Sequence, residues 1–250
     1  MKERPILMSC ESVRAIIDGR KTQTRRIINP QPTCPSLEAK GWFDVTNGSM
    51  IRCPHGEPGD GLWVREAWKL QSFMEGEPLL FRYWADGGEM KERDCDAWNY
   101  EEWWERVCVQ SSDELYAMKW THVDEEGIFT WEGESPLRWR PSIFMPRWAS
   151  RIDLQLLSVR AERLQDISQE DAMAEGMLFL GGMADNWDDA PWADPGDLDQ
   201  HAWRWPRGAF RACWDRINGK RAPWKSNPLV WREEFALVEV RGRQPRKQAG

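Results

Sequence analysis

The order of apolar and polar residues predicts short elements separated by turns in the first part of the chain. Apolar residues recur at helical spacing over 12–18, and Gly19 stands at the usual position after a helix end, so we expect a short helix there. The next segment, 20–28, is polar and then β-prone, and the prolines of 29–35 predict a loop. After a Pro-Gly-Asp-Gly turn, residues 62–68 read as a strand.

The last hundred residues show the clearest periodicity. Alternating apolar positions predict a strand over 151–163. The tetrapeptide Ser168-Gln169-Glu170-Asp171 is a capping box, which predicts a helix that ends at Gly176. A second helix is expected over 207–217, and a final strand from Val230 to Val240.

Two stretches are less regular and are expected to be insertions. Residues 70–140 are acidic, rich in tryptophan and weakly periodic, with a helical piece expected near 96–107 and short strands around 115–131. Residues 181–204 are rich in Gly, Asp and Pro and are expected to form a loop. Because strands and helices do not alternate regularly, the pattern favours one α+β domain over 1–245, built on a small mixed barrel, and disfavours a βαβ sheet.

Composition narrows the class of protein. The chain has 250 residues, of which 41% are apolar and 30% are charged, and this supplies enough apolar side chains for a sizeable core. No run approaches the roughly 18 consecutive apolar residues of a membrane span, and the first residues lack the apolar run of a signal peptide. We therefore expect a cytoplasmic protein, without membrane contact. The 18 tryptophans are expected mainly to pack in the core, with a few available to stack on bases.

The net charge of −7 is unevenly distributed along the chain. Residues 14–26 carry five basic side chains and one acidic side chain, whereas residues 70–135 carry 17 acidic and five basic ones. A protein that coats duplex DNA usually has a large basic surface. A small basic site with acidic surroundings suits a compact anionic or polar ligand better, and we expect the acidic stretches to be solvated.

The cysteines and the absent motifs exclude several kinds of site. Six cysteines include no CxxC pair, and we expect them to be reduced. Cys53-Pro54-His55, with Cys34, offers potential metal ligands. A structural zinc site uses four ligands, however, and the chain has only three histidines, so we expect neither a metal nor another cofactor. The P-loop, Rossmann, zincin and α/β-hydrolase motifs are all absent.

The segment 18–26 carries the most specific chemistry, with Lys21 and Thr24 placed among three arginines, Arg20, Arg25 and Arg26. The arginine charges favour the neutral amine of Lys21, which could then act as a base. Thr24 could be the activated nucleophile, provided that a turn or bulge brings this i, i+3 pair together. The alternative interpretation is a solvated basic turn without chemistry.

Several segments of the chain together resemble an ASCH domain, in particular the larger, Trp-rich ASCH proteins encoded by bacteriophages and prophages. The most distinctive is the helix followed by Gly19-Arg20-Lys21-Thr22-Gln23-Thr24-Arg25-Arg26. Pro58-Gly59-Asp60, before Leu62-Trp63-Val64, is similar to the family's turn into a barrel strand. Residues 159–176 are similar to its strand followed by a capped helix, and Trp231 to Val240 suits its closing strand.

The resemblance implies a PUA-like β-barrel with flanking helices, related to RNA-binding PUA domains, that carries the two insertions. It also implies an activity, because small bacterial members are amidohydrolases that remove the acetyl group from N(4)-acetylcytidine. Their proposed catalytic Lys, Thr and Glu correspond to Lys21, Thr24 and Glu175 in this sequence. The small enzymes have no counterpart of the insertion at 70–140, which could reshape or cover the pocket.

Three functions follow from these observations. An enzyme would hydrolyse an amide on a modified base, nucleoside or nucleotide, with Lys21 as base, Thr24 as nucleophile or water-orienting hydroxyl, and Glu175 as proton carrier or substrate anchor. A binding module would hold RNA or a modified base without turnover. In both cases the candidate substrate contacts are Arg20, Arg25, Arg26, Trp63, Glu66 and Trp68, through charge or through stacking. The third function is that of a phage accessory protein that binds a host protein through 70–140.

Overall fold

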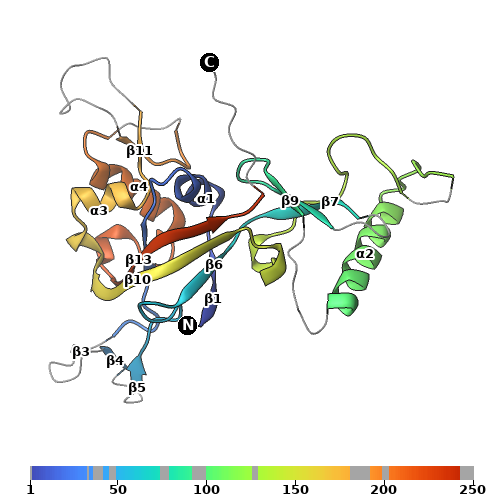
Figure 1. Cartoon of the computed structure of the whole chain (residues 1–250). Coiled ribbons are helices and arrows are strands. Elements are labelled where there is room, and N and C mark those ends of the chain that lie inside the picture. Colours follow the sequence, from blue (N-terminus) through green and yellow to red (C-terminus); the bar gives the residue numbers. More distant parts are fainter. Residues whose placement is uncertain are drawn as a thin grey trace. The chain divides into compact units, whose positions relative to one another are not determined.

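The computed structural model describes residues 2–32, 34–35, 42–44, 49–73, 79–91, 100–125, 129–180, 192–198 and 203–242. The fold is mixed α+β and contains several sheets (Figure 1). The chain divides into two compact units. The first comprises Met1–Ile6, Glu11–Leu62 and Asp153–Val238, and the second comprises Leu7–Cys10, Trp63–Ile152 and Glu239–Gly250.

The largest sheet has five strands that come from both ends of the chain. Their order across the sheet is β1 (Glu3–Leu7), β6 (Gly61–Arg65), β10 (Ile152–Arg163), β13 (Leu229–Val240) and β2 (Gln23–Ile27). Figure 1 shows β6, β10 and β13 side by side. The strands predicted over 151–163 and 230–240 are confirmed as β10 and β13. In the described part of the chain, residues 70–140 add no strand to this sheet, and no closed barrel is seen.

Two helices pack together in the core of the first unit. α3 (Gln169–Ala174) and α4 (Pro206–Asn218) share a buried cluster with β13, and its aromatic side chains are Phe210, Trp214 and Trp224. The Ser168 side chain caps α3, as the capping box predicts. Both predicted helices of this half of the chain are therefore confirmed.

The remaining elements are short. They are α1 (Cys10–Ile17), β3 (Cys34–Pro35), β4 (Trp42–Asp44), β5 (Ser49–Ile51), β11 (Leu178–Phe179), β12 (Trp192–Ala193), and 3-10 helices at Ser142–Phe144, Arg147–Ala149, Leu164–Asp166 and Trp224–Ser226. α1 confirms the helix predicted over 12–18. Most of the predicted loop at 181–204 lies outside the described residues, and β12 falls within it. Among the helices that the structure describes, none combines the length and apolarity needed to cross a membrane.

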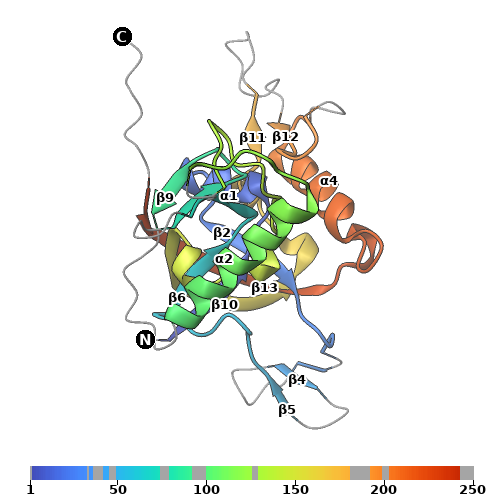
Figure 2. The ribbon, with the colours of Figure 1, turned by 90° about the vertical axis from the view of Figure 1, so that its right-hand side faces the viewer.

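The second unit has a sheet and a core of its own. β7 (Trp68–Ser72), β8 (Leu80–Tyr83) and β9 (Glu89–Lys91) form an antiparallel sheet. Figure 2 shows α2 (Tyr100–Ala117) along most of its length. The sheet and α2 contribute to one buried cluster, which includes Trp68, Leu70, Leu79, Phe81, Tyr83, Val107 and Leu115.

The strand predicted over 62–68 is in fact two strands. β6 ends at Arg65 and β7 begins at Trp68, with Glu66 and Ala67 between them. The break coincides with Glu66, whose buried carboxylate is held by the Arg151 guanidinium. The apolar pattern does not reveal this internal ion pair, which lies at the break between the two strands.

The structure within residues 70–140 also differs from its prediction. The helix expected near 96–107 extends to Ala117, because apolar positions continue at helical spacing into the core of the unit. The strands expected around 115–131 are reduced, among the described residues there, to one bridge between Val123 and Phe129. The strands of this unit come earlier in the chain, where the surrounding acidic residues obscured a short alternation of apolar positions.

Candidate functional site

The ends of two helices fix the backbone at Lys21. After α1 the chain turns at Gly19, whose φ of +75° is open to glycine at little cost. The Lys21 N–H donates to the Ala15 carbonyl at 3.0 Å, and the Thr22 N–H donates to the Ala174 carbonyl at the end of α3 at 2.9 Å. Lys21 is therefore held between the last turns of α1 and α3.

Lys21 and Glu175, which are 154 residues apart, form a buried ion pair. Lys21 Nζ lies 2.7 Å from Glu175 Oε2 and donates a second hydrogen bond to the Glu175 carbonyl oxygen at 2.8 Å. Each side chain is only 5% exposed. The next residue, Gly176, has a φ of +94°, and a Cβ there would lie 2.9 Å from that of Ala15 and 3.1 Å from that of Lys21. The close approach of the α3 end to Lys21 thus requires glycine.

Arg25 joins this pair to two further carboxylates. Its guanidinium nitrogens lie 3.2 Å from Glu175, 2.8 Å from Asp171 and 2.7 Å from Glu162, and the side chain is fully buried. A guanidinium offers five N–H donors in a planar fork, which allows one cation to serve several oxygens. In this arrangement Arg25 fixes the orientation of the Glu175 carboxylate.

Asp171 belongs to the cluster although sequence reasoning gave it only a capping role. Burial alone would raise its pKa, but hydrogen bonds from Gln23 and Arg232, together with the charges of Arg25 and Arg232, outweigh burial and lower the pKa to about 2. Its partners lie at least 61 residues away along the chain, so that no local pattern marks them. The capping box was the one available signal.

Thr24 lies on the other face of β2. Its two neighbours in the strand both bond to Asp171, and side chains alternate along a strand, so Thr24 points the opposite way. Thr24 is the Cα partner of Glu233 on β13 and therefore shares a sheet face with that residue. The structure thus brings Lys21 and Glu175 together, and it directs Thr24 towards the face of Glu233.

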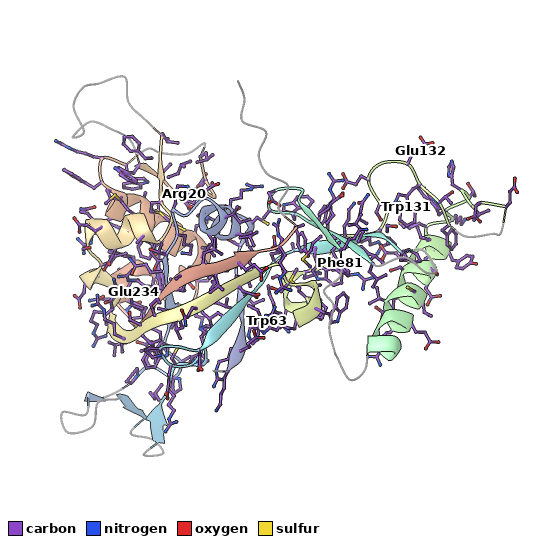
Figure 3. The ribbon with its side chains drawn as sticks, viewed as in Figure 1. Arg20, Trp63, Phe81, Trp131, Glu132 and Glu234 are labelled. Carbon is purple, nitrogen blue, oxygen red and sulfur yellow. The ribbon has the colours of Figure 1, made fainter. Side chains whose placement is uncertain are left out.

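The other two arginines of the segment have different surroundings. Arg20, labelled in Figure 3, lies in the first unit. It donates to the Gly176 carbonyl at 3.0 Å and lies 3.4 Å from Asp18, and its side chain remains 33% exposed. Burial lowers the pKa of Arg26, against the opposing charges of Glu233, Glu175 and Cys53. Arg20 therefore retains access to solvent, which the fully buried Arg25 lacks.

The two tryptophans predicted as stacking faces are buried side chains of the second unit. Trp63 is 8% exposed, and the guanidinium carbon of Arg65 lies 4.8 Å from the centre of its ring. Trp68 is 1% exposed and packs edge-on against Phe81, which Figure 3 labels. A base could stack on Trp68 only if the ring left the core.

Glu66, the remaining predicted contact, is part of an internal ion pair in the same unit. Its two oxygens each accept a hydrogen bond of 2.9 Å from Arg151, which also contacts Asp86 at 2.8 Å. Burial raises the pKa of Glu66 despite Arg151. Burial would also raise the pKa of Asp86. The hydrogen bonds and the charge of Arg151 outweigh this effect of burial, so the pKa of Asp86 is lowered. Glu66 therefore has a structural role in the second unit, as the buried partner of Arg151.

A second cluster of reactive side chains lies around Glu233. Cys53 Sγ and His55 Nδ1 lie 3.3 Å and 2.8 Å from the same oxygen, Glu233 Oε1. Burial and the negative charge of Glu233 raise the pKa of the Cys53 thiol to about 12. The Cys34 side chain, grouped with Cys53 and His55 from the sequence, lies outside the described residues. Sequence reasoning missed Glu233, and the acidic pair Glu233-Glu234 within an apolar strand was the signal that could have found it.

No protein-family model matches the chain, and no curated protein and no solved structure matches it. The resemblance to ASCH domains therefore rests on the sequence motifs alone. The first unit offers a buried lysine–carboxylate pair, an arginine that orients the carboxylate and a second arginine that reaches solvent. Such groups can bind a polar ligand and move a proton.

Proposed function

We propose that the cluster around Lys21 and Glu175 binds a modified nucleobase or nucleoside and hydrolyses its exocyclic amide, as in an N(4)-acylated cytidine. The observation that carries this proposal is the 2.7 Å contact between Lys21 Nζ and Glu175 Oε2. The resemblance to ASCH enzymes assigns catalytic roles to the same two positions, which are 154 residues apart. A buried lysine beside a carboxylate is suited to general acid–base work.

In the proposed reaction, water adds to the carbonyl carbon of the acyl group, and the bond from that carbon to the exocyclic nitrogen breaks. One proton first passes from Lys21 Nζ to Glu175 Oε2, which it contacts. The freed Lys21 amine then takes a proton from the attacking water and returns a proton to the leaving nitrogen. Glu175 holds Nζ in position, and Arg25 holds the Glu175 carboxylate. The products are a carboxylic acid and the unmodified base.

Arg20 is the group we assign to the substrate's phosphate or to the developing oxyanion. It is partly exposed and belongs to the same turn as Lys21. A charged hydrogen bond from a guanidinium to an anionic oxygen is strong and directional. Arg25 acts in the proposal as a positioning residue. Its side chain contacts three carboxylates and has no exposed surface, so it cannot reach the substrate.

We infer that the five-stranded sheet belongs to a PUA-like barrel within a single domain over 1–245. Support comes from which strands form this sheet, because β2, β6, β10 and β13 all overlap the segments that resemble an ASCH domain. The stretches 70–140 and 181–204 are the inferred insertions.

One observation favours a second function, which is binding without turnover. Thr24 shares a sheet face with Glu233, and its neighbours in the strand face Asp171. If the Thr24 hydroxyl takes no part, the same cluster would hold RNA or a modified base through polar contacts alone. Binding of a host protein through 70–140 stays a prediction.

A panel of acylated and otherwise modified nucleosides, incubated with the full chain and followed by mass spectrometry, tests the proposal. We expect at least one N(4)-acylated cytidine to lose the mass of its acyl group. Binding of the panel without any mass change would favour the second function. If the protein neither hydrolyses nor binds any member of the panel, both the proposed hydrolysis and the binding function would be contradicted.

A pair of variants, one at the C-cap of α3 and one within α3, sharpens this experiment. Glu175→Gln keeps the size of the side chain and an oxygen acceptor but removes the charge that faces Lys21, so we expect the rate of hydrolysis to fall. Glu170→Gln makes the same change at an exposed position within α3 and should keep the wild-type rate. Equal rates in the two variants would remove Glu175 from the proposed site.

A further inference from the structure

Three side chains outside the proposed catalytic cluster come together with the donor atoms of a metal site. Cys53 Sγ, one ring nitrogen of His55 and a carboxylate oxygen of Glu233 all lie within 4.8 Å of one another. His55 and Glu233 are 178 residues apart, so the fold itself assembles the group. Glu233 is fully buried, whereas Cys53 and His55 are partly exposed.

A second observation points to a ligand at this place. Glu233 Oε1 receives both contacts, from Cys53 at 3.3 Å and from His55 at 2.8 Å. The other oxygen, Oε2, is buried and has no hydrogen-bond partner among the residues that the structure describes. A buried carboxylate oxygen without a partner is costly and calls for an ion or a water molecule to satisfy it.

The chemistry of the three donors selects the kind of ion. A thiolate, an imidazole and a carboxylate together suit Zn²⁺, whereas Mg²⁺ and Ca²⁺ prefer oxygen ligands alone. Bond lengths of about 2.0–2.3 Å place the ligand atoms of a tetrahedral zinc about 3.3–3.5 Å apart. The Cys53–Glu233 distance of 3.3 Å falls within this spacing, whereas the His55–Glu233 distance of 2.8 Å is shorter, so side-chain rotations would be needed to complete the geometry.

We propose that Cys53, His55 and Glu233 bind one Zn²⁺-type ion, with a fourth position left open to water or a ligand. The thiolate and the carboxylate would neutralise the divalent charge, so the nearby Arg26 would face a centre without net charge. The ion, bound through Glu233 Oε1, would tie the segment that leads into β6 to strand β13. A water molecule in its fourth position would donate to Glu233 Oε2, which has no hydrogen-bond partner among the described residues. This inference is independent of the proposed hydrolysis, which uses none of the three residues.

Metal titration of the full chain tests the proposal. The protein, freed of metal with a chelator, is titrated with Zn²⁺ against a chromophoric competitor and separately with Co²⁺ in the absorption spectrometer. We expect one tightly bound ion per chain and, with Co²⁺, a sulfur-to-cobalt charge-transfer band, because a cysteine thiolate is among the ligands. Absence of binding, or binding without that band, would overturn the proposal.

Single variants locate the ligands. Cys53→Ser, His55→Gln and Glu233→Gln should each weaken Zn²⁺ binding by more than about 10-fold, since even changes outside the first ligand sphere often cost that much. Cys213→Ser, a cysteine of the same unit outside the cluster, should leave affinity and spectrum unchanged. Retention of the charge-transfer band in Cys53→Ser would overturn the assignment.

Two further measurements separate loss of zinc binding from loss of folding and from loss of hydrolysis. Circular dichroism of the metal-free variants shows whether each one folds, and for a variant that does not fold the wild-type Co²⁺ spectrum decides the outcome. Lys21→Arg should bind Zn²⁺ like the wild type, because Lys21 is not a ligand. A protein that binds the ion but hydrolyses no nucleoside would support this inference while contradicting the proposed function.

Discussion

Arg25 shows how a single residue can set the geometry of the whole cluster. One guanidinium faces Glu162, Asp171 and Glu175 and has no exposed surface. Lysine could not replace it, because an ammonium group lacks the planar fork that reaches several carboxylates at once. Without this cation, three carboxylates would remain together with too little positive charge near them, and a buried charge without a partner is strongly destabilising.

Arg25→Met is therefore expected to lower the free energy of unfolding by about 3–5 kcal/mol, the usual cost of breaking a buried ion pair. Arg160→Met offers a matched control, because Arg160 also contacts Glu162 but is 56% exposed. Its cost should stay below about 1 kcal/mol, as for other surface pairs. Urea unfolding of both variants checks this, and similar costs would show that Arg25 is not the centre of the cluster.

Asp171 makes the stability of the protein depend on pH in the acid range. Its pKa is about 2 in the folded chain against an ordinary value of 3.8. Because the folded pKa is the lower one, the stabilisation is complete above about pH 4 and is lost as the pH falls towards 2. The stability difference between wild type and Asp171→Asn, measured by urea unfolding, should shrink over that window. A difference that does not change with pH would contradict the assignment.

At the scale of elements, the end of α3 determines where Glu175 lies. Gly176 combines a positive φ with a close approach to Ala15 and Lys21. We expect Gly176→Ala to destabilise the protein and to displace Lys21. Gly59→Ala is a closely matched control, because Gly59 has the same φ of +94° but no atom within 4 Å of the position that a Cβ would occupy. Thermal unfolding should show the larger loss for Gly176→Ala, and equal losses would mean that backbone strain alone explains the effect.

The elements also show where sequence reasoning succeeds. β10 and β13 are long and half-buried, so alternating apolar residues predicted both of them. The capping box predicted α3 because its signal is local. β8 and β9 were missed because each is only three or four residues long and lies among acidic residues that conceal the alternation. Short strands depend on their tertiary neighbours, which a sequence pattern does not contain.

At the scale of the whole molecule, the chain has two units, each with a buried cluster of its own. Phe81 is fully buried in the second unit, between the rings of Trp68 and Trp148. Phe81→Ala should cost about 3–5 kcal/mol there. We expect hydrogen exchange to lose protection over β7 and β8 while β2 and β13 keep theirs. Equal loss of protection in both units would show that they unfold as one.

The candidate site is also a property of the whole molecule, and this limits what the sequence could reveal. Lys21 and Thr24 were singled out by the basic segment and Glu175 by a family resemblance, whereas Glu162 and Asp171, the other two partners of Arg25, were not named as site residues. These contacts join positions 137 to 154 residues apart, and a single sequence carries no signal for them. The alternation of side chains along β2, which separates Thr24 from Arg25, could be anticipated once the strand was assigned.

The rate at which Lys21→Arg hydrolyses an N(4)-acylated cytidine, compared with the wild type, tests the central claim most directly. Arginine keeps the positive charge but does not deprotonate in proteins, so it cannot serve as the base. We predict a fall of on the order of 10²-fold or more, with a much smaller change in binding. Thr24→Val should behave likewise if its hydroxyl takes part, and the exposed Lys220→Arg should keep the wild-type rate. An unchanged rate in Lys21→Arg, or no hydrolysis by the wild type, would contradict the proposed function.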